Sequence, residues 1–324
     1  MLGMAVWDVA VRPAREQFGY WREVICEAFV PLAPAPLCPV EGFRSRVETR
    51  PYNRIVRARI ASQPQRTSHG IREVARTDGA YVFVNLQIAG TCAAEQGGRR
   101  SLVRPGQFTV VDTTEPYHFE FDGPWRMVSY RLPHEILGGC LDAVRRQTAT
   151  CWPNAGAGAV VAAVMSSMWD LDGSARAAVT SDVEHALVAA LSAATAERDA
   201  VAVDRRAALR AEVQRQVERR LSDPSLDVGS LSRALGVSPR TLHAAVSAGG
   251  ETFAAMVRRR RLERAAALLA DAGSRATITE IAASVGFDGS SSFARAFRRE
   301  FGRAPTDVRR AARGARDGES LRTD

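Results

Sequence analysis

The chain contains no lysine, because all 44 of its basic residues are arginine, and it has only 5 His and 5 Cys among 324 residues. The cysteines show neither C-x-x-C nor any other metal-ligand spacing; they are Cys26, Cys38, Cys92, Cys140 and Cys151. An odd number of unpatterned cysteines is typical of free thiols in a reducing cytoplasm. We therefore expect no disulfide framework, no metal site, no cofactor and a cytoplasmic location.

The sequence also lacks a long apolar run. The longest uncharged stretch, residues 147–169, is rich in Ala and contains Pro153, Gly156 and Gly158. A membrane-spanning helix needs about 20 strongly apolar residues, and the first residues do not have the basic start and apolar core of a signal peptide. We expect no membrane partner.

What the chain does have is an ordinary globular composition, with 46% hydrophobic and 25% charged residues and a net charge of +8. A chain of this length usually forms two domains. Up to residue 204 there are 21 Arg and 22 Asp or Glu, whereas from residue 205 onward there are 23 Arg and 14 Asp or Glu. The positive charge therefore lies in the last third, which suggests a polyanionic partner for that part, although a solvated basic face explains charge alone equally well.

Short strands separated by turn signals fill residues 53–132. The turns include Asp78-Gly79, Pro105-Gly106 and Asp122-Gly123. The expected strands are Asn53–Ile60, Thr67–Arg76, Tyr81–Ile88, Arg99–Val103, Gln107–Asp112, Tyr117–Phe121 and Trp125–Leu132. This spacing favours a small barrel or jelly roll.

Helical patterns follow Pro133. Helices are expected over Ala157–Leu171 and Ser174–Ala196, with residues 197–204 as an interdomain connector. The second helix carries an apolar stripe at helical spacing, made of Val179, Val183, Ala186, Leu187, Ala190 and Leu191. The stripe is interpreted either as packing against the strands or as a dimerisation surface.

Two similar segments, 50 residues apart, stand in the basic third: LSRALGVSPRT from Leu231 and IAASVGFDGSS from Ile281. Each reads as a short helix, a Gly that ends it, and a new helix start, which is a helix-turn-helix pattern. The expected helix caps are Asp227, Ser238 followed by Pro239, the Thr277–Glu280 capping box, and Asp288 or Ser290. One such pattern is weak evidence, but two in tandem favour nucleic-acid binding over a plain helical bundle.

A longer helix, residues 252–270, separates the two units. Its apolar residues change face, since Phe253, Met256 and Val257 point one way and Leu262, Ala265, Ala266 and Leu269 point about half a turn away. The helix therefore bridges two subdomains, and residues 258–261, four consecutive Arg, mark the change of face.

Residues 205–310 resemble the AraC/XylS family of bacterial regulators, through LSRALGVSPRTL, RRRRLERAAALLAD and ITEIAASVGFDGSSSFARAFRREFGRAPTDVRR. LVRPGQFTVVDTTEPYHFEF and RLPHEIL resemble, more loosely, the cupin-like sensor domain of one branch of that family. The resemblance implies an α+β chain of two domains. Residues 1–200 would form a cupin-like β-barrel with flanking helices, which senses an effector and can dimerise. Residues 205–316 would form an all-α domain of two helix-turn-helix units joined by a long helix.

The first unit departs from the family pattern. Ala244 and Val246 stand where the family has a basic residue and a Phe, and Phe253 replaces a Pro. Base reading by this unit is expected to be weaker or different.

A recognition helix presents mainly its N-terminal half to the major groove. The expected base contacts are Arg240, Thr241 and His243 in the first unit, and Ser290, Ser291 and Arg295 in the second; Ser292 and Ala294 share that face, and Arg295 is the best candidate for a bidentate guanine contact. Leu242, Phe293 and Phe297 should be core. The expected phosphate contacts are Ser238, Arg258, Arg259, Arg298 and Arg299.

The family resemblance implies an effector-responsive activator of a catabolic operon, acting with RNA polymerase on double-stranded DNA, as a monomer or a homodimer. A small organic effector is expected in the barrel, near Asn85, Gln87, His118, Trp125 and Tyr130. Two alternatives stay open, a constitutive architectural DNA-binding protein and a cupin-type enzyme. The enzyme is disfavoured because His69 and His118 form no H-x-H pair and no G-x-S-x-G, H-E-x-x-H or Walker motif occurs.

Overall fold

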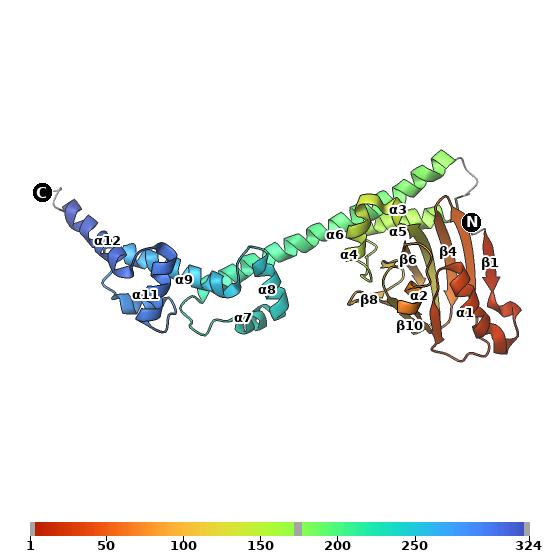
Figure 1. Cartoon of the computed structure of the whole chain (residues 1–324), viewed down its shortest axis with the longest axis horizontal. Helices are drawn as coiled ribbons and strands as arrows, with labels where there is room; N and C mark the ends of the chain where they lie inside the picture. Colours follow the sequence, from red (N-terminus) through yellow and green to blue (C-terminus); the bar gives the residue numbers. More distant parts are fainter. Residues whose placement is uncertain (1–3, 172–176, 321–324) are drawn as a thin grey trace. The chain divides into compact units, whose positions relative to one another are not determined.

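The computed structural model describes residues 4–171 and 177–320, and the chain divides into two compact units between Asp199 and Ala200 (Figure 1). The N-terminal unit is rich in β-structure and the C-terminal unit is helical. The expected α+β organisation is therefore confirmed.

The strands of the N-terminal unit form two antiparallel sheets rather than one closed barrel. In spatial order, the six-stranded sheet contains β1 (Ala5–Asp8), β3 (Arg46–Tyr52), β4 (Ile55–Ser62), β11 (Trp125–Pro133), β6 (Tyr81–Ala89) and β9 (Phe108–Asp112). The five-stranded sheet contains β2 (Ala33–Pro36), β5 (Gln65–His69), β10 (Tyr117–Phe121), β7 (Cys92–Gln96) and β8 (Arg99–Val103).

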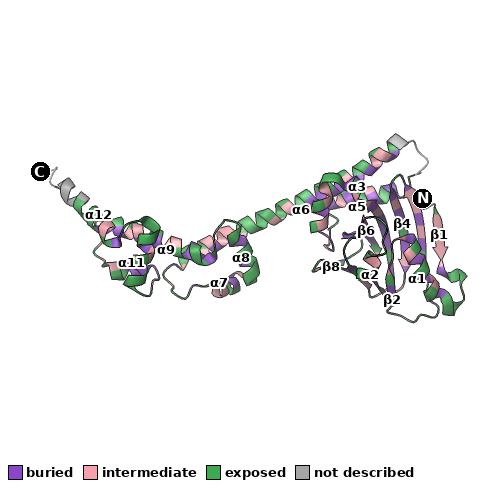
Figure 2. Cartoon of the chain, in the orientation of Figure 1, coloured by how far each residue is buried: buried purple, intermediate pink, exposed green. Residues whose placement is uncertain are grey.

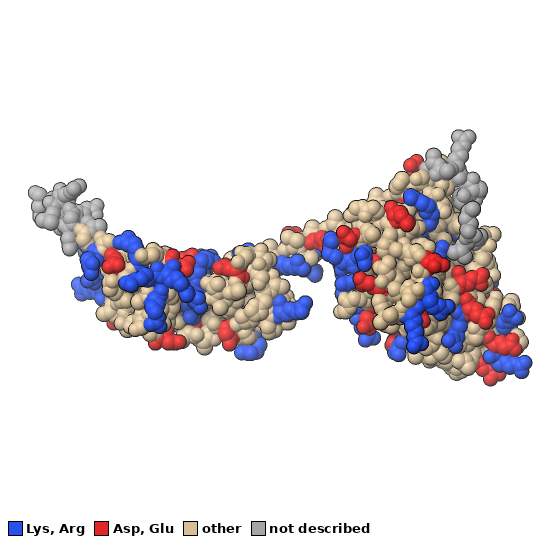
Figure 3. Space-filling view, viewed as in Figure 1, with Lys and Arg blue, Asp and Glu red and all other residues tan. Residues whose placement is uncertain are grey.

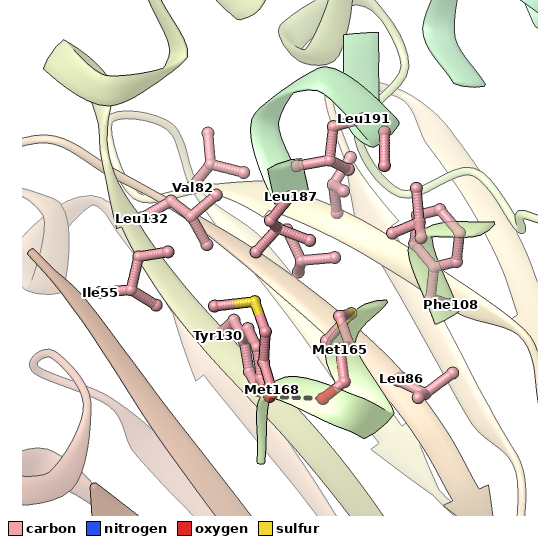
Figure 4. Close-up of a cluster of buried hydrophobic side chains, with 14 of the residues drawn as sticks. Ile55, Val82, Leu86, Phe108, Tyr130, Leu132, Met165, Met168, Leu187 and Leu191 are labelled. Carbon is pink, nitrogen blue, oxygen red and sulfur yellow. Dashed lines mark hydrogen bonds between the residues drawn. The ribbon is translucent and has the colours of Figure 1, made fainter. Parts of the chain in front are cut away.

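The six-stranded sheet packs against other elements on both faces, so most residues of its central strands β4, β11 and β6 are buried. One face meets the five-stranded sheet and α1 (Gln17–Ala28) across an inter-sheet core. This core includes Trp21, Ile25, Phe43, Phe83, Val111, Phe119, Phe121, Trp125 and Met127. Alternate side chains point to the opposite face, and there they form a helix-side core with α5 (Gly156–Met168) and the first part of α6 (Ala177–Arg219) (Figure 4).

The apolar stripe on α6 belongs to the helix-side core. Leu187, Ala190 and Leu191 are buried there against β6 and β11, and Val183 packs at its edge. The packing interpretation holds for these four residues, whereas Val179 and Ala186 of the same stripe are exposed. The expected start of the helix at Ser174 lies outside the described residues.

Several sequence expectations need correction. The expected strand Thr67–Arg76 ends at His69, because Gly70 begins a short helix, α2 (Ile71–Val74), in which Glu73 accepts a hydrogen bond from the Gly70 N–H at 3.0 Å. Residues 197–204, the expected interdomain connector, contain the boundary between the two units and are part of the continuous helix α6. Strands β1, β2, β3 and β7 were not expected. The remaining short helices are α3 (His134–Leu137), α4 (Leu141–Arg146) and the 3-10 turns Val9–Val11, Ala14–Glu16 and Gly138–Cys140.

The C-terminal unit contains the end of α6 followed by α7 (Val228–Leu235), α8 (Pro239–Ser247), α9 (Phe253–Ala270), α10 (Ile278–Ser284), α11 (Ser290–Phe301) and α12 (Pro305–Ser320). Two separate cores hold these helices (Figure 2). The start of α9 gives Phe253, Met256 and Val257 to the first core, and its end gives Leu262 and Leu269 to the second. The predicted change of face along this helix is confirmed.

Candidate nucleic-acid interface

The first helix-turn-helix unit is α7 and α8, and its turn is fixed by local backbone chemistry. Gly236 ends α7 with φ +65°, in the left-handed region that favours glycine. Ser238 caps α8, since its Oγ accepts a hydrogen bond from the Thr241 N–H at 3.1 Å, and Pro239 occupies the first helical position. The Ser238 and Thr241 hydroxyl oxygens also lie 2.7 Å apart. Both caps expected for this unit, Asp227 and Ser238, are confirmed.

The recognition helix α8 is amphipathic. Leu242 and Val246 are buried in the first C-terminal core, whereas Arg240, Thr241 and His243 are exposed near the start of the helix. These three exposed side chains supply one cation and two hydrogen-bonding groups of the kinds that read base edges.

The second unit is α10 and α11, and its two helix starts differ. Thr277 and Glu280 form the expected capping box, with the Glu280 N–H donating to Thr277 Oγ1 at 3.2 Å and the Thr277 N–H donating to Glu280 Oε2 at 2.6 Å. The cap expected for α11 at Asp288 or Ser290 is wrong, because Gly289 occupies the cap position and makes no side-chain cap. The first-turn N–H groups of α11 are therefore free of a side-chain cap, which suits an anion such as a DNA phosphate.

The exposed face of α11 carries Ser290, Ser291 and Arg295 at its start, and Arg298 and Arg299 further along. On the opposite face, Phe293 and Phe297 are fully buried; Phe293 meets Phe287 edge-to-face and packs at a tilted angle on Phe297. Leu242, Phe293 and Phe297 are thus core residues as predicted.

The four consecutive arginines of α9 have different surroundings. Arg258 is exposed, while Arg259 makes ion pairs with Glu251 at 3.0 Å and Glu263 at 2.8 Å. These two carboxylates raise the pKa of Arg259 and occupy its guanidinium. Arg259 is consequently a poorer partner for phosphate than Arg258.

Arg261 joins the two helix-turn-helix units of the C-terminal unit. Its guanidinium donates to the carbonyl oxygens of Leu221 at 3.0 Å and Asp223 at 2.6 Å, which precede α7, and to the carbonyl oxygen of Gly286 at 2.9 Å, in the turn of the second unit. Burial lowers the pKa of Arg261, but an arginine stays charged at this site. Gly286 has φ +82°, and a Cβ there would lie 2.5 Å from the Leu221 carbonyl oxygen. The sequence pattern did not reveal this link, because it depends on contacts between segments far apart.

Part of the unpaired positive charge of the C-terminal unit lies on the recognition helices α8 and α11 and on α9. No ion pair holds Arg240, Arg258, Arg295, Arg298 or Arg299 in the part of the chain that the structure describes. Figure 3 shows arginine side chains gathered over this unit on the face drawn. Exposed guanidinium groups beside two recognition helices can contact both base edges and phosphates.

The N-terminal unit places the expected effector residues in different locations. Asn85 and Trp125 line a cavity in the inter-sheet core. Tyr130 does not, because it points to the helix-side core, where its hydroxyl donates to the Met165 carbonyl oxygen (Figure 4). His118 does not line this cavity either, since it is exposed and its Nδ1 lies 3.0 Å from Ser68 Oγ. Gln87 is buried, but it is not among the residues that line the cavity, and its amide donates to the Ala89 carbonyl oxygen at 2.7 Å.

Within residues 4–171 and 177–320, no group of three or more His, Cys, Asp or Glu side chains could hold a metal ion. None of the described helices is long and apolar enough to cross a membrane.

The fold and these exposed faces define the class of the protein, a transcriptional regulator with a β-rich N-terminal unit and a double helix-turn-helix unit. Residues 21–196 match the family model of the AraC-binding-like domain, and residues 231–311 match that of a helix-turn-helix domain. The chain belongs to the AraC family of transcriptional regulators.

Relatives and structures agree with this assignment. The transcriptional activator NphR of Rhodococcus is 31% identical over 234 residues, which cover 70% of this chain and 69% of NphR. The transcriptional activator RhrA of Rhizobium meliloti is 35% identical over 105 residues, 32% of this chain and 33% of RhrA. An uncharacterised Bacillus protein from a nit 5' region is 34% identical over 133 residues, 41% of this chain, and the match spans half of its length. The crystal structure of the AraC-like activator CuxR has the same fold, with a TM-score of 0.52 at 16% identity, over 81% of this chain and 95% of CuxR.

Proposed function

We propose that this chain is an effector-responsive activator that binds DNA through both helix-turn-helix units and controls transcription of a catabolic operon. The observation that carries the proposal is the pair of recognition helices, each with an apolar face fixed in a core and a polar, cationic face exposed. The activator relatives NphR and RhrA support activation rather than repression.

We assign the reading of bases to the N-terminal halves of α8 and α11. Arg295 is the proposed guanine contact of the second unit, because it is exposed on α11, has no ion-pair partner among the described residues and lies one turn after the three serines. Arg240, Thr241, His243, Ser290 and Ser291 complete the proposed base contacts. Arg258, Arg298 and Arg299 are the proposed phosphate contacts, whereas Arg259 is set aside because of its two carboxylate partners, and the Ser238 hydroxyl is already engaged as a cap.

The test compares two arginines on one helix. Operator sequences are first selected from a random duplex pool with the full-length protein. Arg295→Ala should then lose about 1–3 kcal/mol at a single base pair and relax the preference there, whereas Arg298→Ala should weaken all sequences alike and lower the salt dependence by about one phosphate.

If both variants lose affinity uniformly, the assignment of Arg295 to a base fails. If the full-length protein binds DNA without sequence preference and regardless of added small molecules, the architectural alternative replaces the activator.

We also propose that the N-terminal unit senses an effector and is not an enzyme. The protein would act in the cytoplasm, where it can bind DNA and contact RNA polymerase, and two copies would pair. Pairing is supported by the face of α6 that the helix-side core leaves exposed, which carries Ala186, Ala189, Ala193 and Ala196 at alternating spacings of three and four residues. Sedimentation of the full-length protein and of Ala193→Glu tests this part: a dimer that the substitution dissociates supports pairing through α6, and a monomeric wild type refutes it.

A further inference from the structure

An apolar cavity of about 50 Å³ lies inside the N-terminal unit, between its two sheets and next to α1. Aromatic rings surround it, contributed by Phe29, Phe83, Tyr117, Phe119, Phe121 and Trp125. Phe121 and Trp125 stack with ring centroids 3.9 Å apart. No charged side chain is among the residues that line the cavity.

Two polar side chains that line this apolar space each have a buried atom with no hydrogen-bond partner among the described residues. Asn85 is 3% exposed and its Nδ2 has no hydrogen bond, and Thr67, from the opposite sheet, is 3% exposed with an unbonded Oγ1. Both residues line the cavity. A buried polar group without a partner is costly, since it has lost its water and gained nothing in exchange.

The strand register explains why Asn85 stands where it does. Asn85 pairs with Ser129 of β11 on one side and with Thr109 of β9 on the other, so the three side chains share one face and form a polar row across the sheet. Thr109 is fully buried and also has an unbonded hydroxyl, but it does not line the cavity. A polar row in an otherwise apolar interior is a place where a ligand group can be held.

From this geometry we propose that the effector is a neutral, single-ring aromatic compound that carries one hydrogen-bonding group, and that Asn85 and Thr67 bind this group. The proposal rests on the effector-sensing role proposed above and names the chemical class of the effector. Aromatic walls favour stacking and edge contacts with a ring, and the carboxamide of Asn85 can both donate and accept.

The residues that line the cavity also disfavour other chemical classes of effector. A carboxylate would be buried with no cation beside it, which lowers affinity by a factor of about 100 or more. A sugar would bring several hydroxyls to a wall that offers few partners. Size sets a further bound, because an engineered cavity of about 150 Å³ holds benzene. Binding of a ring here therefore needs the cavity to widen, for which we propose an outward shift of Ile25 in α1 and of Phe29 just after it, which both line the cavity.

The test uses matched neutral and anionic rings on the full-length protein. Benzamide, benzyl alcohol and phenol are titrated against benzoate, phenylacetate and arabinose by calorimetry, with tryptophan fluorescence as a second readout. We expect at least one neutral ring to bind and the corresponding anion to bind at least about 100-fold more weakly.

Near-isosteric variants test which side chains bind the hydrogen-bonding group of the ligand. Asn85→Leu should raise Kd about 10-fold and Thr67→Val about 3- to 10-fold, because each leaves a ligand group unpaired. Thr109→Val, the matched control from the same polar row, should change Kd less than about 2-fold. Asn85→Leu should fold at least as stably as the wild type, since it removes an unpaired buried amide. Loss of binding together with unchanged or raised stability separates a ligand contact from a structural role.

Three outcomes would overturn the proposal: tighter binding of an anion or of arabinose, binding of none of the neutral rings, or equal effects of Asn85→Leu and Thr109→Val. DNA binding and transcription by the same protein are measured in parallel. If DNA binding and transcription persist and respond to a compound of another chemical class, the proposed class of effector is wrong, while the proposed function as an effector-responsive activator stands.

Discussion

Replacement of Arg261 by methionine should uncouple the two helix-turn-helix units while leaving each of them folded. The substitution keeps most of the aliphatic stem but removes the three hydrogen bonds to the carbonyl oxygens of Leu221, Asp223 and Gly286. Hydrogen bonds from a charged donor each contribute about 1.5–3 kcal/mol. Arg261 is half-buried, so water can replace part of this, and we expect a net loss of about 2–4 kcal/mol of unfolding free energy in the C-terminal unit.

The distribution of tryptophan makes this measurable unit by unit. All five Trp residues, at positions 7, 21, 125, 152 and 169, lie in the N-terminal unit. In a urea titration of the full-length protein, Trp fluorescence therefore follows the N-terminal unit, while helical circular dichroism is dominated by the C-terminal unit and α6. Arg261→Met should move the dichroism midpoint to lower urea and leave the fluorescence midpoint unchanged.

Arg258→Met is the matched control, because Arg258 lies on the same helix, is exposed and has no ion pair among the described residues. Its effect on stability should stay within about 0.5 kcal/mol. On selected operators, Arg261→Met should also tolerate altered spacing between the two recognised segments better than the wild type does, whereas Arg258→Met should weaken binding at every spacing. Equal dichroism midpoints for the two variants, or an unchanged spacing preference for Arg261→Met, would refute the coupling role.

Two further predictions concern local chemistry in the same unit. Ser238→Ala removes the cap of α8 and should destabilise the C-terminal unit by about 1 kcal/mol in the same dichroism assay, while Ser238→Asp, which keeps a cap acceptor, should not. Hydrogen bonds from the Ser225 side chain, from Arg220 and from the Ser225 N–H lower the pKa of Asp223 from 3.8 to about 2. The stabilisation by ionised Asp223 is present above its unfolded pKa near 4 and is lost as the pH falls through about 2. The dichroism midpoint of Asp223→Asn should therefore lie at lower urea than that of the wild type at pH 7, and the two midpoints should coincide below about pH 2. A difference in midpoint that does not change with pH would contradict this prediction.

Sequence alone predicted most of the helix caps and helix faces of the C-terminal unit, because these signals are local. Gly236 requires a left-handed backbone, Ser238 and Thr277 bond to N–H groups three residues away, and the apolar positions of α9 change face within one helix. Each of these interactions connects residues within a few positions, so spacing in the chain already fixes it. The core positions Leu242, Phe293 and Phe297 followed from the same periodicity.

The sequence predicted only the fold class of the N-terminal unit, because strand pairing joins residues that are far apart in the chain. The strand β2 reads Ala-Pro-Ala-Pro and is found at the edge of its sheet, where proline breaks no ladder, so its composition gave no strand signal. Side-chain direction was equally hidden. Asn85 and Tyr130 both lie on central strands of one sheet, yet one aims into the cavity and the other at α5, because their registers place them on opposite faces.

The sequence by itself therefore determined the family, the two recognition helices and the location of the positive charge. Only the tertiary structure decided which buried polar groups lack a hydrogen-bond partner. It also decided which arginine joins the two helix-turn-helix units. The reason is physical: helix caps and helical faces are set by neighbours in the chain, whereas the cavity around Asn85 and the carbonyl oxygens around Arg261 are assembled from segments that meet only after folding.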